Sequence, residues 1–239
     1  MERYYCPDLL SGRFDEAESR HCGRVMRHGQ GDLVHAFDGQ GREWKVRLTR
    51  EEAKRWHFEK LTETVSPAPA VRLILAQAVP KNRAMDLILQ KATELGVAEI
   101  APLLSDRVVF KAGEDDGEAK AEKWRETVIE AAKQSGQNWL PLIHPPRRPR
   151  DFFPEVARAP LKVIGSLQPE ARPLKETLRE APAKPASAVV MIGPEGDFTP
   201  AEVGEARAHG FLPVSLGDLV LRSETAALYT LGALKYELM

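Results

Sequence analysis

The segment from Ala188 to Pro200 has the sequence AVVMIGPEGDFTP. Its apolar run is rich in Val and Ile and stops at Gly193-Pro194, which predicts a strand buried on both faces. Thr199 suits the N-cap, Pro200 suits the first helical position, and Glu202 completes a capping box, so a helix begins there. A tight, glycine-bearing loop is expected to join this strand to this helix.

A second strand, loop and helix follow directly. Residues 212–216 predict a short strand, Gly217-Asp218 predicts a turn, and residues 226–238 have the apolar pattern of a helix. In open α/β sheets, ligands bind at the carboxyl ends of the strands. We therefore expect the loops after residues 192 and 216 to face one crevice.

Strands and helices alternate along the chain beyond residue 70, which predicts an α/β domain with a mostly parallel sheet. The expected strands are 71–79, 100–104, 140–143, 162–166, 189–192 and 214–216. The expected helices are 84–95, 120–135, one that begins at Pro200 and ends near Gly210, and 226–238.

The first quarter of the chain has a different pattern, with short strand candidates and turn pairs. Residues 33–37 and 43–48 flank Asp38-Gly39, whose glycine suits a positive φ, so this part predicts a β-hairpin. The proline-rich stretch SPAPA at 66–70 marks the change of pattern. We place a small β domain at residues 1–68 and the α/β domain at residues 71–239.

Composition narrows the class of protein. Hydrophobic residues make up 43% of the 239 residues, enough for a core, and a formal net charge of −1 gives no global field that would attract nucleic acid. Cys6 and Cys22 lack the spacing of metal ligands, and the N-terminus lacks the apolar run of a signal peptide. No apolar segment approaches the length of a membrane span. We expect a soluble cytoplasmic protein without a metal, in which any RNA-binding surface is a local patch.

Two short segments concentrate basic side chains. Residues 20–28 hold three arginines and two histidines, and residues 147–150 hold three more arginines. Such a cluster is either a solvated face or a set of phosphate contacts, and the sequence leaves both interpretations open.

The motifs of several common sites are absent. No G-x-G-x-x-G follows an expected strand, and the chain has no Walker loop, no G-x-S-x-G and no H-E-x-x-H. The two loops do offer backbone N–H groups at helix N-termini, which suit a carboxylate, a phosphate or the edge of a purine. Spacing alone also allows that Gly193, Gly196 and Gly217 only make turns.

Three blocks in the C-terminal part of the chain carry a resemblance: IGPEG at 192–196, SLG at 215–217 and LRSETA at 221–226. They resemble the signature blocks of the SPOUT-class ribosomal RNA small-subunit methyltransferase E family. The resemblance extends upstream to residues 25–27, 38–41, 81–83, 90–97, 100–107 and 131–136. It therefore covers nearly the whole chain.

The sequence departs from the family pattern at Asp197, Ser223 and Gln137, where the family usually has glycine, threonine and arginine. A turn accepts aspartate, and serine keeps the hydroxyl group, so the first two departures are mild. The missing arginine bears on one contact to RNA or substrate.

The resemblance implies transfer of a methyl group from S-adenosylmethionine to N3 of a uridine in 16S ribosomal RNA of the small subunit, by a homodimer. It also implies the fold: a PUA-like, RNA-binding β-barrel domain, then a SPOUT domain with a trefoil-knotted, mostly parallel sheet and helices on both faces. Chain-topology rules argue against knots, so the knot follows from the resemblance alone. Two alternatives stay open: a SPOUT methyltransferase that acts on another RNA such as transfer RNA, and a non-catalytic RNA-binding relative.

Uridine N3 carries a proton, so the base must be unpaired and its imide anion must be favoured. Glu195 and Glu224 lie near expected helix N-termini, where the dipole favours the ionised form and weakens them as bases. We therefore expect Arg222 or Arg107 to stabilise the anion, with Glu224 as the remaining catalytic candidate. The structural alternative for Arg222 is an ion pair with Glu224 or Glu195.

Two sets of binding residues are expected, from the resemblance and from the two clusters of basic side chains. The expected cofactor-binding residues are Leu167, Ile192, Gly193, Pro194, Glu195, Gly196, Leu216, Gly217, Leu221, Arg222, Ser223, Thr225 and Ala226. The expected RNA-binding residues are Arg20, Arg24, Arg27, His28, Lys81, Arg83, Arg147 and Arg148.

Overall fold

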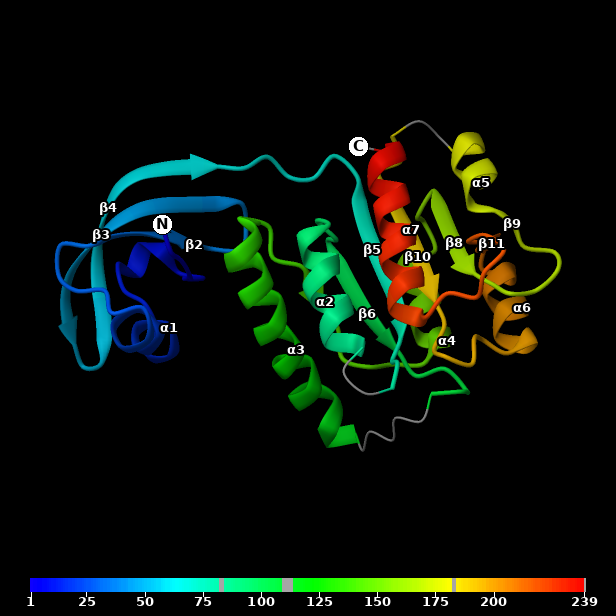
Figure 1. Ribbon diagram of the computed structural model, residues 1–239, viewed down its shortest axis with the longest axis horizontal. Coiled ribbons are helices and arrows are strands. Elements are labelled where there is room, and N and C mark those ends of the chain that lie inside the picture. The colour runs from blue at the N-terminus through cyan, green and yellow to red at the C-terminus, as the bar shows by residue number, and fades with distance from the viewer. Residues whose placement is uncertain (82–83, 109–113, 182–183, 239) are drawn as a thin grey trace. The chain divides into compact units, whose positions relative to one another are not determined.

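The computed structural model describes residues 1–81, 84–108, 114–181 and 184–238. Its contacts divide the chain into two compact units, each with its own sheet (Figure 1). The first unit comprises Met1–Ala68 and Ile129–Leu140, and the second comprises Pro69–Val128 and Pro141–Met239. Residues 129–140 thus group with the first unit, although the sequence boundary places them in the second domain.

The first unit has a four-stranded sheet in the order β1-β2-β3-β4. Strand β1 pairs parallel with β2, whereas the pairs β2-β3 and β3-β4 are antiparallel. The expected hairpin is confirmed, because β2 and β3 flank residues 38–41 and Gly39 has a φ of +74°. The bounds are β1 (Arg3–Tyr5), β2 (Leu33–Phe37), β3 (Arg42–Glu52) and β4 (Arg55–Val65).

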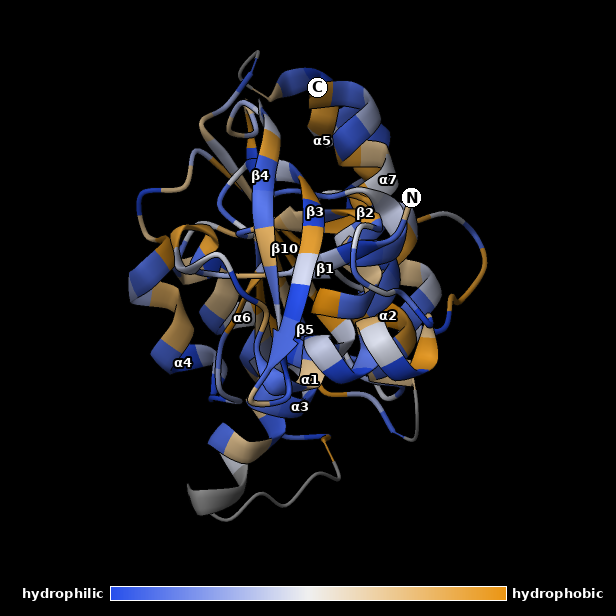
Figure 2. Ribbon diagram, turned by 90° about the vertical axis from the view of Figure 1, so that its left-hand side faces the viewer, coloured by the Kyte–Doolittle hydropathy of each residue, from blue (hydrophilic) through white to orange (hydrophobic). Residues whose placement is uncertain are grey.

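Apolar side chains fill the first unit. Tyr4, Phe14 and Leu48 are fully buried in one cluster with Trp56 and Phe58. Figure 2 shows β4 coloured hydrophilic over much of its length, in agreement with the exposure of its second half. The helical elements of this unit's N-terminal part are η1 (Leu9–Ser11), α1 (Glu16–Arg20) and the π-helical turn η2 (His21–Val25).

The second unit has a seven-stranded sheet in the order β7-β6-β5-β10-β8-β11-β9. Every pairing among these described strands is parallel, which confirms the mostly parallel sheet. The bounds are β5 (Arg72–Ala78), β6 (Glu99–Leu103), β7 (Leu142–Ile143), β8 (Leu161–Gly165), β9 (Arg172–Pro173), β10 (Ser187–Ile192) and β11 (Leu212–Ser215). The trefoil knot stays a prediction.

Helices cover both faces of this sheet. On one face, Val189 and Met191 of β10 pack in a cluster with Phe152, Phe153 and Val203 from α4, η3 and α6. On the other face, α7 contacts β5 and β10 and packs beside α2 (Figure 1). The bounds are α2 (Ala84–Glu94), α3 (Glu114–Ser135), α4 (Pro149–Phe152), η3 (Phe153–Val156), α5 (Leu174–Glu180), α6 (Pro200–Ala208) and α7 (Ser223–Leu238).

The sequence signals placed the start of α6 correctly, but they placed the starts of α3 and α7 too late. The capping box of α6 is present, with Thr199 N donating to Glu202 Oε2 at 2.8 Å and Glu202 N donating to Thr199 Oγ1 at 3.2 Å. Helices α3 and α7 both begin earlier than expected, at Glu114 and Ser223. Their first turns are polar, so the apolar pattern used to place these helices starts after the backbone has become helical.

No helix among the described residues is long and apolar enough to cross a membrane. No group of three or more His, Cys, Asp or Glu side chains in these ranges is placed to hold a metal ion.

Candidate functional site

A cavity of about 450 Å³ in the second unit is lined by the loops that follow β8, β10 and β11. These strands are neighbours in the sheet and run parallel, so their carboxyl ends meet at one edge. The sequence predicted the loops after β10 and β11 as partners. It did not predict that the loop after β8 forms a third wall, although Leu167 of that loop was among the expected cofactor-binding residues.

The loop after β10 folds tightly back on itself. A Cβ atom on Gly193 would lie 2.9 Å from Asp197 Oδ1 and 3.1 Å from Phe198 N. The 2.9 Å contact is to a side-chain oxygen and the backbone contact is tight at 3.1 Å, so a side chain at this position would displace atoms of the loop itself.

Asp197 joins two walls of the cavity. It has a φ of +60°, a left-handed conformation that costs energy for a residue other than glycine. Its Oδ1 accepts a hydrogen bond from Phe198 N at 2.8 Å, and its Oδ2 accepts one from Leu167 N at 3.2 Å. The carboxylate therefore ties the β10 loop to the β8 loop, a contact that glycine could not make.

The start of α7 is held by a buried polar network. Ser223 Oγ donates to Gly193 O at 2.6 Å and accepts from Gln77 Nε2 at 2.9 Å. Ser223 is 4% exposed and Gln77 is fully buried in β5. The sequence did not point to Gln77, although a glutamine within the apolar run LILAQA was a signal that could have found it.

Large apolar side chains stand open around the cavity. Leu167, Leu219 and Val220 all line it and are 63%, 79% and 76% exposed. Exposed apolar side chains gathered at one site typically mark a binding surface. The polar groups among them include the carboxyl groups of Glu195 and Asp218 and the hydroxyl group of Ser215.

Arg107 lies outside the lining of the cavity. Its Nη1 donates to the carbonyl oxygen of Gly196, and a Cβ on Gly196 would lie 3.3 Å from Arg107 Cδ. The neighbouring residue of the same loop is also held in place, because Asp106 N donates to Glu202 Oε1 at 2.9 Å. Arg107 thus braces the β10 loop from its outer side.

Arg222 is exposed at the residue before α7, between two residues that line the cavity. Among the described residues its side chain makes no ion pair, so the alternative pairing with Glu224 or Glu195 is not formed. Glu224 lies in the first turn of α7, and neither it nor Thr225 lines the cavity.

Ten of the thirteen predicted cofactor-binding residues line the cavity, and Gly196, Arg222 and Thr225 do not. The lining residues that the sequence did not predict are Gly165, Ser166, Gln168, Pro169, Ala171, Asp197, Ser215, Asp218, Leu219 and Val220.

The predicted RNA-binding residues differ in their surroundings. Arg20, Arg24 and His28 line a second cavity, in the first unit. Arg27, Lys81 and Arg148 are exposed, and Lys81 N donates to Glu195 Oε1 at 2.8 Å. Arg147 is engaged internally, in an ion pair with Glu155 and 5.8 Å above the ring of Phe152. Arg83 lies outside the described residues.

Comparison with known proteins decides the family. A family model described as an RNA methyltransferase domain matches residues 66–235, and one described as an RNA methyltransferase PUA domain matches residues 14–61. Ribosomal RNA small subunit methyltransferase E of Synechocystis is 34% identical over 88% of this chain and 68% of that protein. The chain belongs to the ribosomal RNA small subunit methyltransferase E family.

Other members of the ribosomal RNA small subunit methyltransferase E family match over the whole length. The Bacillus subtilis member is 28% identical over 99% of this chain and 97% of its own. The crystal structure of the Neisseria gonorrhoeae member, bound to S-adenosyl methionine, has a TM-score of 0.84 at 31% identity, over 99% of this chain and 97% of that one. A methyltransferase structure from Legionella pneumophila with bound SAM has a TM-score of 0.88, 31% identity and the same coverage.

Proposed function

We propose that this chain uses S-adenosylmethionine to methylate N3 of a uridine in 16S ribosomal RNA. The observation that carries the proposal is the cavity at the carboxyl ends of β8, β10 and β11. It lies within the residues matched by the RNA methyltransferase model, and relatives of this chain have been solved with the cofactor bound.

The residues of the cavity fit this cofactor. Its volume of about 450 Å³ lies within the roughly 300–1,000 Å³ of small-molecule pockets. Leu167, Leu219 and Val220 offer apolar surface for an adenine ring, and Glu195 and Asp218 offer acceptors for an ammonium group and ribose hydroxyls. In pockets of this kind, a small number of polar groups fixes the orientation of the ligand.

When bound, S-adenosylmethionine supplies a methyl group on a positively charged sulfur, which is already electrophilic. The task of the chain is to align the acceptor base, exclude water and favour the imide anion left when the N3 proton passes to solvent. Glu224 is a weak base for this proton because it lies in the first turn of α7, where the helix dipole favours its ionised form.

Arg222 is our candidate for stabilising the imide anion. Its guanidinium is exposed and makes no ion pair with any described residue, and it stands next to Ser223 at the cavity. The guanidinium of Arg107 already donates to Gly196 O. A planar fork of donors suits the two carbonyl oxygens that share the charge of the anion, so an uncommitted arginine is the better stabiliser.

We also propose that the active form is a homodimer. Tyr229 and Tyr236 on α7 are 52% and 88% exposed, and Leu87 on the adjacent α2 is 41% exposed. The two tyrosines are seven residues apart, on the same side of the helix. Aromatic side chains exposed in this way are enriched at interfaces between proteins. Light scattering should give twice the mass of the chain, and Tyr236→Glu should shift it towards the monomer.

The reaction is tested with the purified full chain, S-adenosylmethionine and small ribosomal subunits that lack the modification. Mass spectrometry of the digested RNA should find N3-methyluridine in 16S ribosomal RNA. A parallel reaction with transfer RNA in place of the subunits tests the first alternative function, which methylation of transfer RNA but not of 16S ribosomal RNA would favour. Calorimetry that detects no binding of S-adenosylmethionine would favour a non-catalytic RNA-binding relative.

A further inference from the structure

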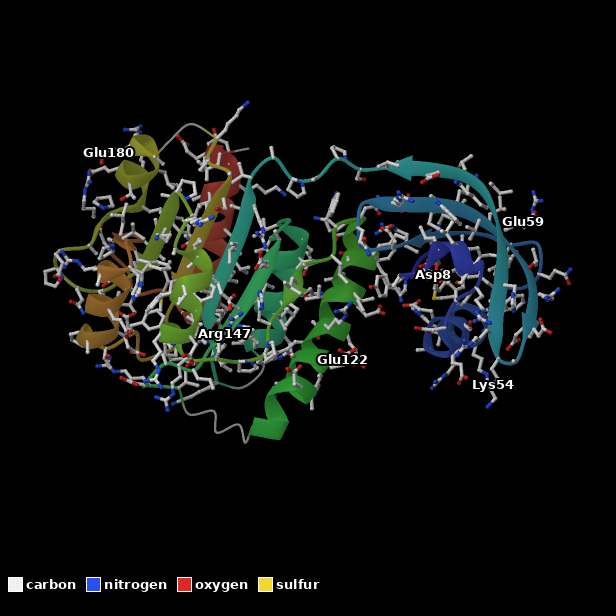
Figure 3. All side chains as sticks on the ribbon, turned by 180° about the vertical axis from the view of Figure 1, so that it is seen from behind. Asp8, Lys54, Glu59, Glu122, Arg147 and Glu180 are labelled. Carbon is white, nitrogen blue, oxygen red and sulfur yellow. The ribbon has the colours of Figure 1, made fainter. Side chains whose placement is uncertain are left out.

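Strand β5 ends beside the proposed methyl-transfer cavity without lining it. None of its residues, Arg72–Ala78, belongs to the lining, although β10 is its neighbour in the sheet and Gln77 is the register partner of Ile192. Figure 3 shows β5, in teal, next to α7, in red, and the two elements are in contact. Any effect of β5 on the cavity must therefore pass through other residues.

Gln77 differs from the rest of β5 because it is polar and fully buried. Every other residue from Leu73 to Ala78 is apolar and buried. The Oε1 atom of Gln77 has no hydrogen-bond partner among the described residues. A buried oxygen without a partner lowers stability, and a methionine of similar volume would avoid that loss. Stability alone therefore gives little reason for a glutamine at this position.

The hydrogen bonds of Gln77 run in one direction. Its Nε2 donates to Ala78 O and to Ser223 Oγ, both at 2.9 Å. The amide cannot turn over, because its oxygen would then face the carbonyl oxygen of Ala78. A serine hydroxyl has one proton, and here that proton is donated to Gly193 O at 2.6 Å. Gln77 thus sets the direction in which the Ser223 hydroxyl donates.

The Ser223 hydroxyl connects two parts of the site. Gly193 lies in the loop after β10 and lines the cavity. Ser223 begins α7, and in the same turn the carbonyl oxygen of Arg222 accepts from Ala226 N at 2.8 Å. Rotation of the hydroxyl would release Gly193 O, so the β10 loop could move relative to Arg222.

We propose that Gln77 is a positioning residue for methyl transfer, an assignment that rests on the proposed function. It acts through Ser223: by fixing the direction of that hydroxyl, it holds the β10 loop of the cofactor cavity in place relative to Arg222. A misplacement of about 1 Å can cost about 10²-fold in rate, so a buried amide that touches no substrate can still govern turnover.

Gln77→Met tests this role because it removes the amide and nearly keeps the volume. It removes an unpaired oxygen together with the donor, so it should unfold at nearly the wild-type denaturant concentration. Its single-turnover rate at saturating S-adenosylmethionine should nevertheless fall by roughly tenfold or more. Calorimetry without RNA should show an affinity for S-adenosylmethionine about threefold lower, because a looser site must be ordered on binding.

Thr93→Val is the matched control. It removes a buried hydrogen bond, from Thr93 Oγ1 to Leu89 O at 2.8 Å, within α2 and outside the cavity lining. It should keep the wild-type rate and affinity. A loss of rate equal to that of Gln77→Met would indicate a general effect of lost buried hydrogen bonds and would overturn the proposal.

The double variant Gln77→Met with Ser223→Ala tests the route of the effect. If Gln77 acts only through Ser223, the double variant should be no slower than Ser223→Ala alone. Two losses that multiply would show that Gln77 acts by another route and would overturn the assignment.

Gln77→Asn is a second variant that keeps the proposal testable if Gln77→Met does not fold, since its amide is one methylene shorter and cannot keep both hydrogen bonds. Wild-type rate and affinity in a folded Gln77 variant would overturn the role of Gln77 and leave the proposed function intact. A wild-type chain that binds no S-adenosylmethionine would overturn both. If the chain methylates a different RNA, the calorimetric comparison still decides the role of Gln77, because it contains no RNA.

Discussion

The hydroxyl group of Ser223 donates a 2.6 Å hydrogen bond to the carbonyl oxygen of Gly193. It joins the first residue of α7 to the first residue after β10, so one bond connects two loops of the cavity. Gln77 on β5 donates to the same hydroxyl at 2.9 Å. The shape of the cavity edge therefore depends on three residues that lie far apart in the sequence and are all buried.

Ser223→Ala should lower the free energy of unfolding by about 1–3 kcal/mol, because it leaves Gly193 O and Gln77 Nε2 with fewer partners in a buried place. It should also weaken binding of S-adenosylmethionine by releasing the two loops from each other. Chemical denaturation and calorimetry measure the two effects. Ser223→Thr keeps the hydroxyl group and is the matched control, which should bind the cofactor like the wild type. Equal stability of Ser223→Ala and the wild type would show that the bond has no net effect.

Gly193→Ala should be much more damaging than Gly196→Ala. At Gly193 the new Cβ would meet backbone atoms of Asp197 and Phe198 at 3.1 Å, and backbone cannot move aside cheaply. At Gly196 it would meet Arg107 Cδ at 3.3 Å, the stem of an exposed and flexible side chain. We expect Gly193→Ala to lower both the melting temperature and the affinity for cofactor, and Gly196→Ala to change either only slightly. Thermal denaturation and calorimetry of the two variants measure these effects. Equal losses of melting temperature and cofactor affinity in the two variants would contradict the prediction.

Arg222→Lys should lower the methylation rate by roughly 10²-fold to 10³-fold while leaving the affinity for cofactor and RNA nearly unchanged. The negative charge on the base grows only as N3 loses its proton, so the lost interaction belongs to the transition state. Lysine presents a single point charge in place of the planar fork of arginine. The rate of the variant should also need a higher pH to reach its plateau.

Single-turnover rates over a pH series measure this effect, and Arg107→Lys provides the comparison. Because Arg107 donates to Gly196 O outside the cavity lining, we expect a smaller loss of rate there. A wild-type rate and pH profile in Arg222→Lys, with a large loss in Arg107→Lys, would move the role of anion stabiliser to Arg107.

Stability of the chain should fall as the pH rises from about 4.5 to about 7, because of Glu18. Burial raises the pKa of Glu18 to about 7, although Lys133 Nζ lies 3.1 Å from its Oε1 and opposes the shift. The folded state therefore holds this proton more tightly than the unfolded state, so the stabilising contribution is complete below about pH 4.5 and is lost by the time the pH passes 7.

Denaturant unfolding at several pH values measures this loss, and Glu18→Gln should reduce the pH dependence across that window. Glu130→Gln is the matched control, because Glu130 also pairs with Lys133, at 2.8 Å, but its side chain is 62% exposed. It should keep most of the pH dependence of the wild type, because the charge of Glu130 is a lesser cause of the raised pKa of Glu18 than burial is. Parallel curves for Glu18→Gln and the wild type would show that Glu18 ionises normally in the folded chain.

Local signals in the sequence were enough for the elements whose causes are local. The capping box of Thr199 and Glu202, the turn at Gly39 and the apolar run of β10 each depend on residues within a few positions of one another. Parallel strands bring their carboxyl ends to one edge, so the sequence also placed the loops after β10 and β11 at one site.

The sequence by itself thus determined the strand and helix pattern, the edge of the sheet that carries the cavity and, through the resemblance of its signature blocks, the family. Only the tertiary structure decided that Gln77 holds Ser223, that Asp197 binds Leu167, and that the β8 loop forms a third wall. It also grouped residues 129–140 with the first unit. The physical reason is that such contacts join residues tens of positions apart, and their geometry is set by strand order and side-chain packing, which no local spacing records.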